Sequence, residues 1–232
     1  MLTPLKPSDS PDPDCDPAPG QPSHLSPIFS QGQRGRLLAG ALQVVSEHGY
    51  PATTVAQIIA AAHISRKTFY EQFANKQECV LAAYDLVVEW LGGQVAEALA
   101  GVESWRQGVA ITVRTILARL DDDPRLVRLC AIEILALGRV GIARYEASVE
   151  RLAIPLRAGR ARCPWGTELP LSLEETVVGG AIWLTGHRTR LGGGASLTEL
   201  APDLTYFLLV PYLGTPQARL KAAAGVFPLG AA

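Results

Sequence analysis

The feature that most constrains this chain is a group of closely spaced helix-start signals in the first third of the sequence. Thr54 is followed three residues later by Gln57, the spacing of a capping box that satisfies free backbone N–H groups at a helix start. Ser65 opens a second helical pattern, and Asn75 with Glu78 opens a third in the same way. Caps this close together predict short helices that are joined by tight turns.

The remaining patterns are helical as well. Apolar residues recur at helical spacing from Arg34 to the stop signal at Gly49, and Phe69 and Phe73 can share one buried face because they lie four residues apart. Further helices are predicted over residues 76–91 or beyond, 105–120, 124–138, 140–156, 173–190 and 197–213. No segment shows sustained alternation with period two, so the sequence predicts an all-α fold.

Composition limits the class of protein. Hydrophobic residues make up 48% of the chain and charged residues 19%, so it can bury a sizeable core. The net charge is −1, but residues 31–80 hold five basic residues against three acidic ones, which puts a basic face in one short segment. The four cysteines lie far apart, so we expect no disulfide framework, metal site or cofactor. No run reaches the roughly 18 apolar residues of a membrane span, so we expect no membrane partner and a cytoplasmic location.

The first thirty residues differ from the rest of the chain. They contain eight prolines and four aspartates, with few large apolar side chains. Such a stretch cannot bury enough surface to offset the entropy lost on ordering. Residues 1–30 are therefore expected to form a disordered tail that can be removed without loss of folding.

Two short helices joined by a tight turn form a helix-turn-helix, whose second helix enters the major groove of DNA. Arg66, Lys67 and Thr68 fall in the first turn of that helix, where side chains can reach base edges. Tyr70 and Lys76 suit phosphate oxygens, as do hydroxyls at the helix starts. An ordinary solvated helix face is the alternative interpretation for Arg66 and Lys67. The predicted DNA contacts are Thr54, Ser65, Arg66, Lys67, Thr68, Tyr70 and Lys76.

The segment from Arg34 to Leu81, which includes HGYPATTVAQIIAAAHISRKTFYEQFANKQECVLAAYD, resembles the DNA-binding domain of the tetracycline-repressor (TetR) family. The runs ETVVGGAIWLTGHRTRL and LTELAPDLTYFLLVPYLG resemble the last two helices of many members. The resemblance implies a repressor that binds a palindromic double-stranded operator as a homodimer and is released by a small-molecule effector. Two positions depart from the family pattern, because His63 stands where the turn usually has glycine and Lys67 replaces a small residue.

The resemblance also implies that different segments of the chain have different functions. The expected segments are a tail over 1–30, a three-helix DNA-binding domain over 31–80, a helical effector-binding and dimerisation domain over 81–215, and a C-terminal tail over 216–232. The last two predicted helices are apolar on more than one side, which independently favours a helix–helix interface between subunits. The predicted dimer interface comprises Val177, Gly180, Ala181, Leu184, Leu204, Phe207 and Leu208.

Effector-pocket candidates are aromatic or polar side chains set among apolar ones, each of which could equally be an ordinary core or interface residue. Glu133 stands out because it lies inside an apolar run, so its carboxylate needs an arginine partner or an effector that carries donors. The structural pair is the preferred interpretation. The candidates are Trp90, Trp105, Cys130, Glu133, Tyr145, Trp183 and His187.

Other functional classes have weaker support. No Gly-x-Ser-x-Gly, phosphate-binding glycine loop or His-Glu-x-x-His occurs, so the chain is not expected to be an enzyme. The main alternative is a helical small-molecule binding or carrier protein that binds no operator. A further alternative is a family member that activates transcription or responds to a protein partner.

Overall fold

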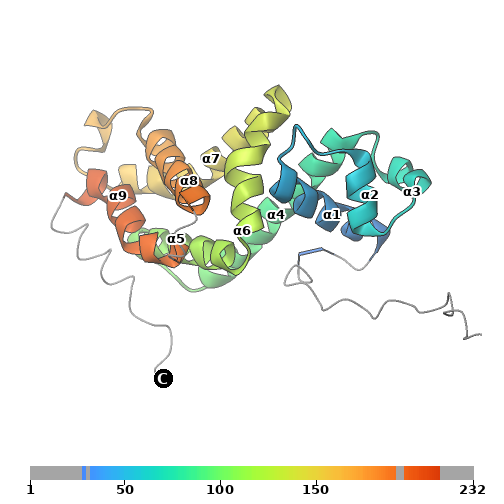
Figure 1. Cartoon of the computed structure of the whole chain (residues 1–232). Helices are drawn as coiled ribbons and strands as arrows, with labels where there is room; N and C mark the ends of the chain where they lie inside the picture. Colours follow the sequence, from blue (N-terminus) through green and yellow to red (C-terminus); the bar gives the residue numbers. More distant parts are fainter. Residues whose placement is uncertain (1–27, 30–31, 192–195, 215–232) are drawn as a thin grey trace, which may run out of the picture.

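The computed structural model describes residues 28–29, 32–191 and 196–214, and within these ranges the chain is helical and contains no strand. Three helices form the N-terminal lobe: α1 (Gln33–His48), α2 (Val55–Ala62) and α3 (Arg66–Gln72) (Figure 1). All three predicted caps are present. The amide N–H groups of Gln57, Thr68 and Glu78 donate to the side-chain oxygens of Thr54, Ser65 and Asn75 over 3.0–3.2 Å.

Helix α4 (Lys76–Ala98) runs from the N-terminal lobe into the rest of the molecule (Figure 1). Its length and composition alone would allow it to cross a membrane. However, Glu78, Asp85 and Glu89 interrupt the apolar run, and its first half is buried within the protein. Alternating burial and charge of this kind is typical of an amphipathic core helix.

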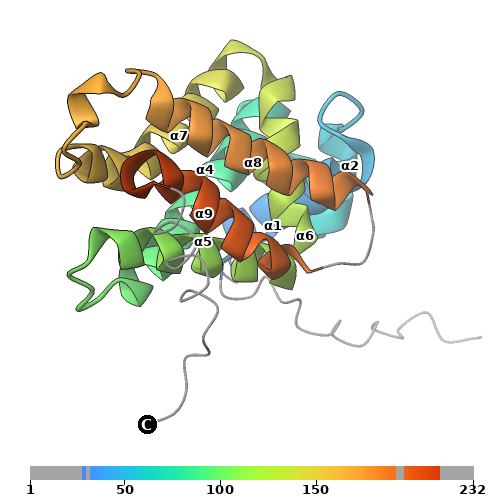
Figure 2. The same ribbon diagram turned by 90° about the vertical axis from the view of Figure 1, so that its left-hand side faces the viewer.

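The second lobe is built around α4 by four longer helices: α5 (Trp105–Asp122), α7 (Arg139–Arg160), α8 (Leu173–Leu191) and α9 (Ala201–Leu213). Figure 2 shows α8 and α9 side by side on the face opposite the N-terminal lobe. Short 3-10 turns, Gly166–Glu168 and Leu197–Leu200, precede α8 and α9. Helix α9 continues past Pro211 for two more residues before Gly214 closes the final turn.

The predicted helix over 124–138 is instead three short pieces. Helix α6 (Pro124–Val127) passes into a π-helical turn, η1 (Arg128–Ile132), and then a 3-10 turn, η2 (Glu133–Leu137). Gly138 ends the series with a positive φ of 68°. Changes of helical pitch rotate successive side chains away from one common face. This segment can therefore present residues to both lobes.

A buried ion pair joins the last three long helices. Glu174 on α8 accepts two hydrogen bonds of 2.9 Å from Arg160 on α7, and one of 2.8 Å from the Tyr212 hydroxyl on α9. Burial by itself raises the pKa of Glu174, but these hydrogen bonds outweigh it and hold the pKa below its usual range. The carboxylate stays charged and links three helices through one group.

The predicted boundary of the tail differs from the structure. Residues 1–27, most of the expected tail, lie outside the described residues, as do 215–232. Ile28 and Phe29, by contrast, are buried and belong to the hydrophobic core. Two adjacent apolar side chains at the end of a proline-rich segment have little effect on the apolar content averaged over thirty residues. The packed structure therefore begins before residue 31.

We expect Ile28→Ala and Phe29→Ala each to lower the free energy of unfolding by about 2–4 kcal/mol, because each removes a buried side chain. Chemical denaturation would measure the change. The matched control is Leu171→Ala, since the Leu171 side chain is 93% exposed and its removal should change stability by less than about 0.5 kcal/mol. Equal, small effects in all three variants would contradict this placement of Ile28 and Phe29.

Candidate nucleic-acid interface and apolar cavity

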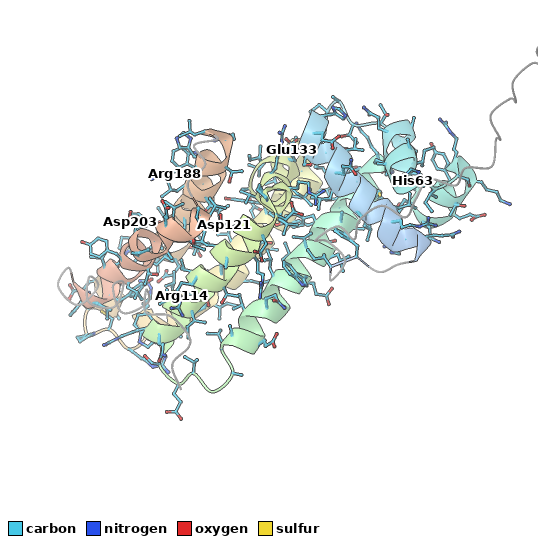
Figure 3. The ribbon with its side chains drawn as sticks, turned by 60° about the horizontal axis from the view of Figure 1, so that its bottom comes forward. His63, Arg114, Asp121, Glu133, Arg188 and Asp203 are labelled. Atoms are coloured by element: carbon cyan, nitrogen blue, oxygen red, sulfur yellow. The ribbon has the colours of Figure 1, made fainter. Side chains whose placement is uncertain are left out.

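The turn between α2 and α3 depends on a left-handed residue. His63 has φ 51° and ψ 49°, and it is the one non-glycine residue with positive φ in the described part of the chain (Figure 3). The Ile64 N–H donates to the Ile59 carbonyl over 3.0 Å and closes the turn. Histidine adopts this conformation at some energetic cost that glycine would avoid. The departure from glycine noted in the sequence therefore falls on the residue that sets the angle between the two helices.

Helix α3 presents a basic, exposed edge. The apolar residues Phe69 and Phe73 are fully buried and fix its orientation, which leaves Arg66 and Lys67 on the outside. Arg66 has no hydrogen bond or ion pair with any described residue, and Lys67 makes only a 3.9 Å surface pair with Glu71. Such a surface ion pair contributes little to stability, so Lys67 can leave Glu71 for another anion. Both cations are therefore available to an external anion.

The other predicted contacts on this face have partial internal roles. Tyr70 is 52% exposed and packs edge-on against Phe69 at 5.3 Å, leaving its hydroxyl outward. The hydroxyls of Ser65 and Thr68 lie 2.9 Å apart, and Thr54 is occupied by its capping box with Gln57. Thr54 and Ser65 are exposed and Thr68 is half-buried. These groups stand at the starts of α2 and α3, where an anion meets free N–H groups.

Lys76, a predicted phosphate contact, has several partners within the protein. Its ammonium donates to the carbonyls of Thr53, Tyr50 and Pro51 at 2.7, 3.1 and 3.4 Å, and lies 4.7 Å from the centre of the Tyr50 ring. An ammonium has three N–H donors, so these carbonyls use all of them. Lys76 therefore ties the start of α4 to the loop between α1 and α2.

A second tie in the N-terminal lobe could not be predicted. The Arg34 guanidinium lies 4.5 Å from the centre of the Phe73 ring and donates to the Gln72 carbonyl at 3.5 Å. These contacts hold the end of α3 against α1. No sequence signal marks them, because they join residues about forty positions apart.

Glu133 forms the polar link between the two lobes (Figure 3). Its carboxylate accepts a 2.8 Å hydrogen bond from the Tyr50 backbone N–H and lies 3.4 Å from the Arg128 guanidinium. Gly49, with φ 79°, allows the chain to turn there, and a Cβ on it would lie 3.5 Å from the carboxylate. The sequence expectation of a buried carboxylate with an arginine partner is confirmed. The backbone partner from α1–α2 was not foreseen.

A cavity of about 330 Å³ lies in the second lobe between α4, α5, α7, α8 and α9. Its walls are mostly apolar. Two predicted pocket residues, Cys130 and Tyr145, line it. Burial raises the pKa of Cys130 to about 12 and also raises the pKa of Tyr145, so both groups remain neutral.

The other five pocket candidates lie elsewhere. Trp105 lines a smaller cavity beside Tyr212, and Glu133 lies between the lobes. Trp90 is half-buried against the core, while Trp183 is 60% exposed and stacks on His187 at 4.9 Å. Aromatic and polar character was a poor guide because this cavity is lined chiefly by aliphatic side chains. Periodicity in α7 was the better signal, since Tyr145, Ser148, Leu152 and Pro155 face the cavity.

The predicted dimer residues divide into two groups. Val177, Leu204 and Leu208 are buried within the protomer, and Ala181, Leu204 and Leu208 line the cavity. Gly180 and Phe207 are on the exposed face of α8 and α9, and Leu184 is half-buried. Trp183, predicted for the pocket, is exposed on the same helix as Gly180. The outward face is thus narrower than the apolar pattern suggested.

Comparison with known proteins supports the N-terminal assignment. Residues 37–83 match the family described as bacterial regulatory proteins, tetR family. This span contains the helix-turn-helix and the start of α4. This N-terminal segment is therefore similar to the tetR family, and the match extends no farther than residue 83.

Individual relatives agree at the level of fold. An uncharacterized HTH-type transcriptional regulator of Mycobacterium tuberculosis is 39% identical over 66 residues, which span 28% of this chain and only 30% of the relative. The fatty acid degradation regulator FadR from Bacillus halodurans has a TM-score of 0.68 at 20% identity, covering 78% of this chain and 96% of FadR. FadR from Bacillus subtilis, solved in complex with stearoyl-CoA, has a TM-score of 0.60 at 20% identity, covering 75% and 96%. The TetR-like fold therefore extends through the second lobe.

The Glu133 link can be tested by two substitutions. Glu133→Ala leaves the Tyr50 N–H without its acceptor and should lower the free energy of unfolding by about 2 kcal/mol. Glu133→Gln keeps an acceptor oxygen in nearly the same place, so it should cost less than about 1 kcal/mol. Chemical denaturation of both variants provides the comparison. If the two substitutions were equally damaging, the hydrogen bond to Tyr50 would not be the important contact.

Proposed function

We propose that this protein is a DNA-binding transcriptional repressor whose α3 enters the major groove of its operator. The observation that carries the proposal is the exposed pair Arg66 and Lys67 on a helix whose opposite face is anchored by Phe69 and Phe73. Arginine and lysine at the start of a recognition helix suit the O6 and N7 acceptors of guanine. The hydroxyls of Tyr70 and Thr54 would contact phosphates. Lys76 would act indirectly, by holding the α1–α2 loop.

The proposed repressor acts as a homodimer through the outer face of α8 and α9. Trp183 and Phe207 are 60% and 49% exposed, and a Cβ on the exposed Gly180 would lie 3.9 Å from the Phe207 ring. Gly180 has no side chain to keep a partner helix away. Exposed aromatic groups on adjacent helices are typical of protein interfaces. Two copies related by a two-fold axis would present two α3 helices to a palindromic site.

The cavity in the second lobe is the proposed effector site. Its mostly apolar lining suits an apolar ligand, and the similar fold of FadR from Bacillus subtilis was solved with stearoyl-CoA. Cys130 and Ala131 of η1 line the cavity, while Arg128 of the same turn lies beside Glu133 and hence beside the α1–α2 loop. A ligand that shifts η1 would therefore act on the loop that Lys76 and Glu133 both hold, and so release the operator.

Arg66→Ala and Lys67→Ala should each weaken binding to the selected operator by about 1–3 kcal/mol, because each removes a base contact. Gel-shift titration at fixed salt would measure the loss, and circular dichroism would verify that helicity is unchanged. Arg139→Ala is the matched control, since Arg139 is also exposed but lies on α7.

Unchanged operator affinity in both α3 variants would remove α3 from the interface. Failure of the unaltered protein to select any duplex would instead support a carrier protein that uses the cavity alone.

A further inference from the structure

The wall of the cavity is mostly apolar, and only a few hydroxyl groups line it. The Tyr84 hydroxyl is paired with Ser148 at 2.7 Å, and the Thr185 hydroxyl donates to the Ala181 carbonyl at 2.9 Å. Burial raises the pKa of Tyr84 to about 12, so that group is neutral at physiological pH. The interior of the cavity therefore suits the apolar part of a ligand.

Arg151 is the one charged residue among the described residues that line the cavity. It lies on α7 with its guanidinium at the edge of the cavity, exposed to solvent. A Cβ on Gly92 of α4 would lie 3.0 Å from Nη2, so the guanidinium rests over the α4 backbone where no side chain intervenes. The cavity thus has a cation on its rim, between α4 and α7.

This cation has no partner among the described residues. No hydrogen bond or ion pair joins Arg151 to any of them. The acidic residue next to it in sequence, Glu150, is instead bound by Arg157, which also binds Glu175. An unpaired arginine with planar, forked donors is suited to bind a carboxylate through two parallel hydrogen bonds.

We propose that the cavity takes an amphipathic carboxylate, with its apolar part inside and the carboxylate on Arg151 at the rim. The inference rests on the proposed effector site and specifies the chemistry of its ligand. The apolar part accounts for the aliphatic walls, and the carboxylate accounts for the unpaired guanidinium. A thioester of the same acid would bring no charge to this position, so the proposal distinguishes a free acid from its coenzyme A ester.

Calorimetric titration of the full chain with dodecanoate, dodecanol and dodecanoyl-coenzyme A tests the proposal. We expect dodecanoate to bind about three- to fivefold more tightly than dodecanol, as one solvent-exposed charged pair allows. Arg151→Gln should abolish that difference, and Arg151→Lys should retain part of it. Arg139→Gln is the matched control, because Arg139 is an exposed arginine of the same helix that does not line the cavity, and it should leave the preference unchanged.

Equal binding of dodecanoate and dodecanol, or a preference that survives Arg151→Gln, would overturn the proposal. The proposal would also be overturned if the coenzyme A ester bound more tightly than dodecanoate and Arg151→Gln left its affinity unchanged. Failure of all three compounds to bind would overturn it as well. Operator binding by the ligand-free protein is measured separately. Its failure would refute the proposed DNA-binding function without bearing on the carboxylate preference.

Discussion

Helix α4 has to pack against both lobes at once, and the rest of the structure depends on this constraint. Near its start, Cys79, Val80 and Ala83 are buried in the core that includes α1. Farther along, Leu91 and Val95 line the cavity of the second lobe. A continuous helix is stiff over this length, so a displacement at one end is carried to the other. One element therefore provides a mechanical connection between the cavity and the N-terminal lobe.

The irregular segment after α6 supplies a second connection, which is polar. A regular helix would place every fourth residue on one face, whereas the π and 3-10 turns let Cys130 face the cavity and Glu133 face the α1–α2 loop. The carboxylate of Glu133 requires partners because it is buried. Arg128 lies in the same segment as Glu133, whereas the Tyr50 N–H comes from the other lobe, so moving the lobes apart would leave that donor unpaired. Segment 128–137, through Glu133, and helix α4, through Lys76, thus both hold the α1–α2 loop in position.

Local interactions were the predictable part of this protein. The caps at Thr54, Ser65 and Asn75 follow from contacts between residues three positions apart, and the structure has all of them. The all-α fold and the helix-turn-helix followed from these caps and from helical periodicity. Interactions between residues far apart in the sequence were harder to predict. Lys76 could be seen as a cation at a helix start, but its three carbonyl partners come from a loop more than twenty residues away.

Apolar periodicity also could not separate two destinations for the same kind of residue. Leu204 and Phe207 lie on one apolar helix, yet the first lines the cavity and the second faces outward. The distinction depends on how α8 and α9 cross, which no local pattern encodes.

The mass of the protein on selected duplex DNA is the most direct test of the central claim. Selection from a random duplex library should enrich an inverted repeat, and light scattering of the complex should give two chains per site. A single chain bound with full affinity to one half-site, or no enrichment at all, would contradict the account.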